Sequence, residues 1–211
     1  METRIPELLG PVASYYSDKL AEHGETARGV DWNGDESQQL RFHQLAQILR
    51  PSSGFSINDL GCGYGALFDY LQARYQDFSY YGYDVSSDMV RAAISRYDGK
   101  PQAQFYVAAG PLQLADYGIA SGIFNVRLKC NPVEWGKYIE ATLDVLNQSS
   151  RFGFAFNCLT SYSDQDKVKD HLYYASPSAL FDLCMQRYSR YVALLHDYAL
   201  YEFSILVRKT P

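Results

Sequence analysis

The 211-residue sequence predicts an α/β fold in which helices cover both faces of a mostly parallel sheet. From residue 55 onward, short apolar segments with strand character alternate with segments whose apolar residues recur at helical spacing. A glycine-rich turn joins the first predicted strand of this region to the first helix. Only a few residues separate the last two predicted strands, which is typical of an antiparallel hairpin.

The first fifty residues are expected to form a helical lid, distinct from a catalytic domain over residues 51–211. Apolar spacing predicts helices over residues 12–23 and 37–49, and Pro51 ends the second helix. The glycine-rich loop between them contains Trp32, an unusual residue for a loop that only faces solvent.

Seven strands and four helices are predicted in the remainder. The strands are expected at residues 55–60, 79–85, 104–108, 117–124, 151–159, 191–196 and 200–208. The helices are expected at residues 66–74, 88–97, 133–146 and 178–186, and the last two follow the start signals Asn131-Pro132 and Ser176-Pro177. Sheets of this kind bind ligands at the carboxyl ends of their strands, so we expect the active site there.

Composition argues against several function classes. The chain has 24 acidic and 19 basic residues, a net charge of −5, and no basic run, so no nucleic-acid partner is expected. No apolar run reaches the roughly 18 residues of a membrane helix, and the N-terminus lacks a signal-peptide pattern. The four cysteines form no CxxC pair, which predicts no metal site and a reducing, cytoplasmic location.

The strongest motif is INDLGCGYGAL, in which Gly61, Gly63 and Gly65 follow the first predicted strand. Glycines allow a tight turn and let a ligand approach the backbone closely. Asp84 lies 19 residues after Gly65, at the end of the next strand, where a carboxylate can accept hydrogen bonds from ribose hydroxyls. The glycines alone leave two cofactor classes open, because Gly61, Gly63 and Ala66 also fit the dinucleotide pattern.

Asp59 before the loop and Gly65 at its fifth position favour a different ligand. The combination DLGCGYG, followed by an acidic residue that ends the second strand, resembles the class I S-adenosylmethionine (SAM)-dependent methyltransferases. The closing strand YEFSILVRK is similar to the hairpin that ends their fold, and the resemblance covers about residues 55–208. It implies a Rossmann-like sheet and an enzyme that transfers a methyl group from SAM and leaves S-adenosylhomocysteine.

The resemblance also implies positions for the cofactor. Asp84 would bind the ribose hydroxyls, and Asn125 would lie near the reacting centre. Ala109 and Gly110 stand where many family members carry an acidic residue, so the group that recognises the adenine amino group is left open. The cofactor residues that the resemblance implies in this core are Asp59, Gly61, Cys62, Gly63, Gly65, Asp84, Val85, Met89, Ala109, Gly110 and Asn125.

Three lid residues complete the cofactor prediction. Arg41 is a candidate partner for the SAM carboxylate because a guanidinium binds carboxylates with two parallel hydrogen bonds; an exposed surface arginine is the alternative. Tyr16 and Trp32 are expected to close over the sulfonium, since an aromatic face beside a cation is stabilising. Simple packing within the lid is the alternative for both aromatic residues.

A long polar loop, NCLTSYSDQDKVKDHLYYASP, follows the fifth predicted strand and supplies further catalytic candidates. Tyr162 lies in this loop, and His171 is a candidate general base, with a surface histidine as the alternative. YYSDKLAEHGETARGVDWN, NCLTSYSDQDKV and HLYYASP also resemble a bacterial subgroup that includes azetidine-2-carboxylate synthases. In that reaction the SAM amino group attacks its own γ-carbon and releases methylthioadenosine, and Asn125, Tyr162 and Ser189 would hold the amino group.

Methyl transfer to a small molecule is the leading hypothesis. A chain of this length leaves only the lid and two loops to build an acceptor site, so no large recognition surface is expected. SAM cyclisation is the main alternative, and a SAM-binding regulatory module or a nicotinamide-dependent reductase are the others. We expect a monomer or homodimer without a membrane partner.

Overall fold

The computed structural model describes residues 5–51 and 53–210. Its parallel strands are β1 (Phe55–Leu60), β2 (Phe78–Asp84), β3 (Ala103–Val107), β4 (Ala115–Ala120) and β5 (Ser150–Thr160). Two antiparallel strands close the sheet, β7 (Tyr191–Leu195) and β8 (Glu202–Arg208). A two-residue strand, β6 (Tyr174–Ala175), pairs with the end of β5.

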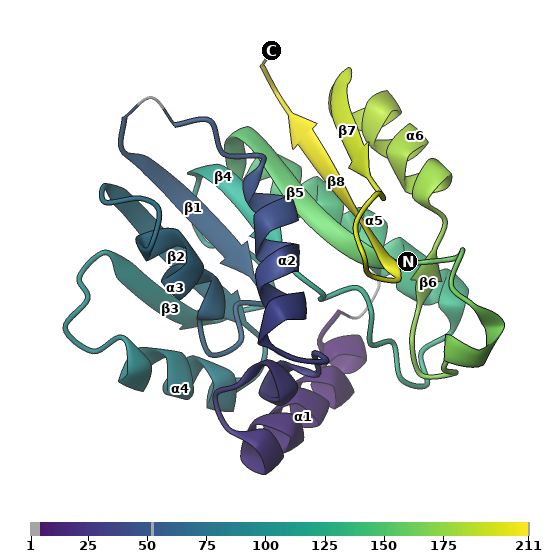
Figure 1. The fold of residues 1–211 in the computed structure, drawn as a ribbon, viewed down its shortest axis with the longest axis horizontal. Helices are drawn as coiled ribbons and strands as arrows, with labels where there is room; N and C mark the ends of the chain where they lie inside the picture. The colour runs from purple at the N-terminus through teal and green to yellow at the C-terminus, as the bar shows by residue number, and fades with distance from the viewer. Residues whose placement is uncertain (1–4, 52, 211) are drawn as a thin grey trace.

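These strands form one sheet in the order β3-β2-β1-β4-β5-β8-β7, with β6 beside β5 (Figure 1). The predicted Rossmann-like α/β class and the C-terminal antiparallel pair are confirmed. Seven strands were predicted, and the described residues form eight. The strand missing from the prediction is β6, whose two residues are too few to show an alternating pattern.

Four helices accompany the strands: α3 (Ala66–Gln72), α4 (Ser87–Arg96), α5 (Pro132–Gln148) and α6 (Pro177–Arg187). The last two begin at the prolines of the predicted start signals, one residue before the predicted starts at 133 and 178. The Asn131 side chain accepts a hydrogen bond from the Val133 N–H at 2.8 Å, and Ser176 caps α6 in the same way through the Ala179 N–H. Proline at the first helical position has the backbone angle that both helices require.

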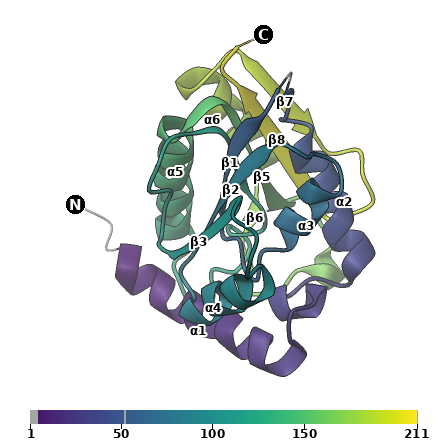
Figure 2. The ribbon, with the colours of Figure 1, turned by 90° about the vertical axis from the view of Figure 1, so that its left-hand side faces the viewer.

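The N-terminal segment forms α1 (Ile5–His23), a 3₁₀ turn η1 (Ala27–Val30) and α2 (Asp35–Ala46). Helix α1 begins before residue 12, where it was predicted to start. The prediction started late because Gly10 and Pro11, which the helix includes, are poor helix formers. Figures 1 and 2 show α1 lying beyond the carboxyl ends of the parallel strands, outside the two helical layers.

Helices α2 and α3 cover one face of the sheet, and α5 and α6 cover the other (Figure 2). Phe68 of α3 is fully buried on the first face. Trp135 of α5 is fully buried on the second face, where its indole N–H donates to the Phe124 carbonyl at 2.8 Å. Both layers leave the ends of β1, β2 and β4 open toward α1, which places the loops after these strands at one edge.

The described residues contain no membrane-spanning helix, no metal-binding cluster and no disulfide. None of their helices combines the length and the apolar character needed to cross a bilayer. They contain no group of three or more His, Cys, Asp or Glu side chains that could hold a metal ion. The four cysteines are free thiols.

Candidate active site

The glycine turn after β1 is built as the sequence predicts. Gly61, Gly63 and Gly65 all have positive φ angles, of 77°, 54° and 86°. The Gly63 N–H donates to Oδ2 of Asp84 at 2.9 Å, and the Ser86 N–H donates to Oδ1 at 2.8 Å. The two predicted halves of the motif are therefore in direct contact, and backbone hydrogen bonds fix the orientation of the Asp84 carboxylate.

A cavity lies over this turn. Ten of the predicted cofactor residues line it: Tyr16, Trp32, Asp59, Gly61, Cys62, Gly63, Asp84, Val85, Met89 and Ala109. Gly65 and Gly110 do not. A side chain at Gly65 would meet the rings of Tyr97 and Phe105, so this glycine lets the turn pack against the core.

Asp59 lies at the floor of this first cavity and is only 2% exposed. Burial raises the pKa of Asp59 to about 7; a hydrogen bond from the Tyr80 hydroxyl opposes the rise, and the negative charge of Asp84 adds to it. Burial also raises the pKa of Asp84, against the lowering effect of its backbone hydrogen bonds. The cavity thus carries two carboxyl groups, and one of them titrates near neutral pH.

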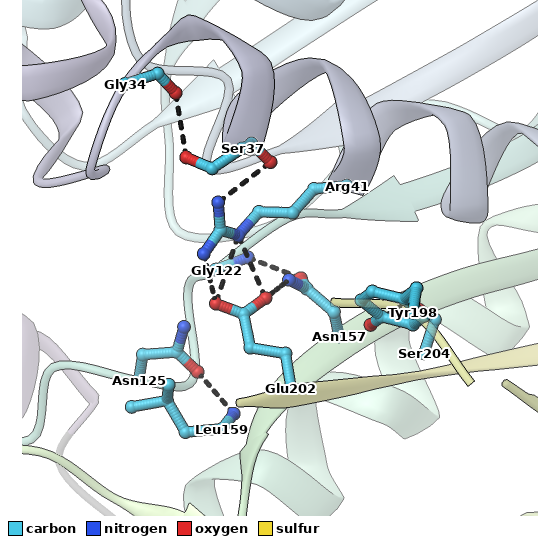
Figure 3. Close-up of polar contacts among 10 residues, drawn as sticks. All are labelled: Gly34, Ser37, Arg41, Gly122, Asn125, Asn157, Leu159, Tyr198, Glu202 and Ser204. Atoms are coloured by element: carbon cyan, nitrogen blue, oxygen red, sulfur yellow. Dashed lines mark hydrogen bonds and ion pairs between the residues drawn. The ribbon is translucent and has the colours of Figure 1, made fainter. Parts of the chain in front are cut away.

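A second cavity adjoins the first. Tyr16, Val30, Trp32 and Gly122 line both cavities and form their shared wall. Asn125 lines only the second cavity and is 5% exposed. Its Oδ1 accepts a hydrogen bond from the Leu159 N–H at 3.0 Å, whereas its Nδ2 has no hydrogen-bond partner within residues 5–51 and 53–210 (Figure 3).

Arg41 has a protein partner, contrary to the prediction that it would pair with a ligand carboxylate. Its Nη2 lies 2.6 Å from Oε1 of Glu202, its Nε lies 2.9 Å from Oε2, and its Nη1 donates to the Ser37 carbonyl at 2.9 Å (Figure 3). Glu202 is 1% exposed and also accepts from Nδ2 of Asn157 at 2.6 Å. The guanidinium lies 3.7 Å from the centre of the Trp32 ring.

The sequence prediction missed Glu202 altogether. The signal was present, because Glu202 is a charged residue at the start of the apolar strand YEFSILVRK. A charge in such a strand requires a buried partner of opposite sign. Arg41 is 161 residues away in the chain, so the sequence did not identify it as that partner.

Three predicted catalytic residues lie away from both cavities, and these predictions are corrected. The Ser189 hydroxyl donates to the Arg208 carbonyl, at the end of β8 that faces the amino ends of the parallel strands. Tyr162 is 71% exposed, with its ring 6.0 Å from that of His196. His171 is half-buried, and its carbonyl accepts from the backbone of the segment after Asn125. Proximity to a strand end therefore did not fix where these side chains point.

Comparisons with known proteins agree with this architecture. The model of a family described as a methyltransferase domain matches residues 57–149, a segment that contains the glycine turn, Asp84 and Asn125. Putative methyltransferase Rv1506c of Mycobacterium tuberculosis (strain ATCC 25618 / H37Rv) is 63% identical over 163 residues, which cover 77% of this chain and 98% of that protein.

Two solved structures have similar folds at low sequence identity. Magnesium protoporphyrin IX methyltransferase (ChlM) from Synechocystis PCC 6803, with bound SAM, has a TM-score of 0.64 and 14% identity, covering 94% of this chain and 97% of that chain. The DhpI–SAH complex has a TM-score of 0.65 and 15% identity, covering 94% of this chain and 95% of that chain. These two likenesses concern the fold alone.

The Arg41–Glu202 pair yields a stability prediction. Arg41→Met leaves Glu202 charged and buried, so we expect the free energy of unfolding to fall by about 3–5 kcal/mol. The double variant Arg41→Met/Glu202→Gln should recover much of this loss, because no buried charge remains and Asn157 can still donate to an amide oxygen. Urea unfolding measures both, with Arg187→Met in the exposed Arg187–Glu140 pair as a control that changes stability by less than about 1 kcal/mol. Equal stability of the single and double variants would contradict this account.

The raised pKa of Asp59 yields a pH prediction. Its carboxyl pKa is about 7 in the folded chain and about 3.9 when unfolded, so between these values the folded state binds more protons. Its contribution to stability is therefore present below about pH 4 and lost as pH rises toward 7. Relative to Asp59→Asn, the parent should lose roughly 2–4 kcal/mol across this window in urea unfolding. Parallel pH profiles for the two proteins would refute it.

Proposed function

The chain belongs to the class I SAM-dependent methyltransferases, and we propose that it transfers the methyl group of SAM to a small-molecule acceptor. The first cavity would hold SAM and the second would hold the acceptor. The observation that carries this proposal is the shared wall, at which the two cavities meet beside Gly122 and Trp32. A donor and an acceptor bound on either side of such a wall meet in an orientation fixed by the protein, which lowers the entropic cost of reaction.

The residues of the first cavity have the chemistry that SAM requires. A carboxylate offers about four lone-pair positions, and the Gly63 and Ser86 N–H groups use two of those on Asp84. The remaining positions are available for the two ribose hydroxyls. Val85 and Met89 supply an apolar surface for the adenine, and the glycine turn lets the backbone approach the methionine portion.

When bound, SAM supplies an electrophilic methyl group. The chain contributes orientation and the exclusion of water. Asn125 would orient the acceptor by donating a hydrogen bond from Nδ2, because its Oδ1 is already held by the Leu159 N–H. No strongly basic side chain is required if the acceptor atom is already nucleophilic. The mechanism therefore does not depend on Tyr162, His171 and Ser189, which line neither cavity.

We propose that residues 1–50 act as a lid over both ligands. Support comes from Tyr16 of α1, Val30 of η1 and Trp32 of the following loop, which line both cavities. A Cβ atom at Gly122 would lie 2.4 Å from two Trp32 ring carbons, so the lid can pack this closely only over a glycine. The proposed boundary at residue 50 falls in the segment between the end of α2 at Ala46 and the start of β1 at Phe55.

SAM cyclisation is the alternative reaction. It uses a single substrate and needs no space for another molecule beside it. The second cavity favours transfer for this reason, since it extends well beyond the wall that it shares with the first.

Asp84 provides a test of SAM binding. We expect Asp84→Ala to weaken SAM or S-adenosylhomocysteine binding by about 2–3 kcal/mol, the scale of lost hydrogen bonds to a charged group. Isothermal titration calorimetry measures this. Asp88→Ala is the matched control, because Asp88 lies on α4, pairs with Arg91 and lines neither cavity. An affinity equal to that of the parent would remove Asp84 from the ribose site.

Product analysis tests transfer against cyclisation. Incubated with SAM alone, the enzyme should release no methylthioadenosine, and S-adenosylhomocysteine should form only when an acceptor mixture is added. Asn125→Ala should lower kcat by roughly 10-fold or more with little change in SAM affinity, because it acts on acceptor orientation. Mass spectrometry identifies the products. Methylthioadenosine from SAM alone would establish cyclisation instead.

A further inference from the structure

We propose that the acceptor carries an oxyanion, of the carboxylate or phosphate type, and that Lys167 and Lys169 bind it at the outer part of the second cavity. This inference rests on the proposed function and specifies its substrate class. The inference is based on three residues that line this cavity: Asn125, whose Nδ2 has no hydrogen-bond partner among the described residues, and two lysines whose charges are only weakly compensated by acidic side chains.

The other charges of the second cavity are already neutralised within the protein. Arg41 and Glu202 form the buried ion pair described above. Asp31 lies 3.3 Å from Nζ of Lys19 and accepts a hydrogen bond from the Tyr15 hydroxyl at 2.7 Å. Together with Lys19, which lies outside the cavity wall, these three residues sum to zero net charge.

The two lysines are different. Among the described residues, the Lys167 ammonium group pairs with its neighbour Asp166 alone. Both side chains are more than half exposed, so this ion pair is weak. The ammonium group of Lys169 has no partner among the described residues. The acidic residues of the same loop, Asp164, Asp166 and Asp170, do not line the cavity. The cavity wall consequently carries an excess of positive charge, which attracts anions into a concave site.

The loop that carries the lysines is anchored. The Tyr174 hydroxyl accepts from the Lys169 N–H at 3.0 Å and donates to the Lys167 carbonyl at 3.3 Å. Tyr174 itself pairs with β5 as part of β6. The two ammonium groups therefore extend from a fixed backbone, which lowers the entropic cost of ordering them around a ligand.

The position of the lysines orients the acceptor. Lys167 and Lys169 line only the second cavity, whereas Gly122 and Trp32 lie in the wall shared with the first. The methyl-accepting atom must approach the shared wall, so the oxyanion lies at the opposite end of the molecule. The Asn125 Nδ2 group and the two ammonium groups are hydrogen-bond donors. Oxygen atoms of the acceptor at these places would accept their hydrogen bonds, which are stronger where one partner is charged.

The test uses the enzyme saturated with S-adenosylhomocysteine and three probes: inorganic phosphate, succinate and succinamide. Succinamide has nearly the size of succinate but no charge. We expect calorimetry to show phosphate or succinate binding at low salt, weakened about tenfold by Lys167→Gln/Lys169→Gln, with no comparable effect on succinamide. Lys129→Gln is the matched control, because Lys129 is exposed and lines neither cavity. The tighter of the two anions identifies the oxyanion type.

Two results would overturn the inference while leaving the proposed function intact. One is equal binding of succinate and succinamide, and the other is unchanged anion binding in the double lysine variant, each with normal S-adenosylhomocysteine affinity. A parent enzyme that binds no S-adenosylhomocysteine would instead refute the proposed function itself. The double variant must retain the parent's cofactor affinity, which shows that it is folded.

Discussion

A guanidinium and a carboxylate that are both buried must neutralise each other, because an unpaired buried charge costs several kcal/mol. Arg41 and Glu202 meet this condition where α2 crosses the end of β8. The pair also reaches outward in two directions. The Arg41 guanidinium faces the Trp32 ring, while Glu202 holds Asn157, whose Oδ1 accepts from the Gly122 N–H at 2.7 Å. One ion pair thus joins the N-terminal segment, the closing hairpin and the loop after β4 (Figure 3). Residues of all three parts line the second cavity.

This constraint explains why the sequence predicted one half of the site better than the other. The glycine turn and Asp84 depend on neighbouring strands and on backbone conformations that glycine permits, so their spacing in the sequence fixes their geometry. Arg41 depends on a partner 161 residues away, and no local pattern encodes that contact. The prediction recognised that a bidentate carboxylate would bind this guanidinium and assigned the carboxylate to a ligand rather than to the protein.

The remaining errors have a similar physical origin. The strand pattern located the ends of β1, β2 and β5 to within one residue but placed the end of β4 at residue 124, four residues beyond Ala120. The sheet order brings the loops after β1, β2 and β4 together. Such a pattern does not fix the direction of a side chain within a loop. Tyr162 follows β5 closely yet faces solvent, and Ser189 precedes the antiparallel β7, so it lies at the opposite edge from the site. β6 depends on pairing with β5, which two residues cannot signal.

The cavity proposed for SAM and the cavity proposed for the acceptor differ in the charged side chains that line them. Within the described part of the chain, the first cavity is lined by the carboxyl groups of Asp59 and Asp84 and by no lysine or arginine. The second has lysines as its only weakly compensated charges. The sulfonium centre and ribose hydroxyls of SAM suit the carboxyl groups of the first cavity, whereas the lysines of the second cavity attract an oxyanion. The different charges that line the two cavities therefore match different parts of the two ligands that must react at the shared wall.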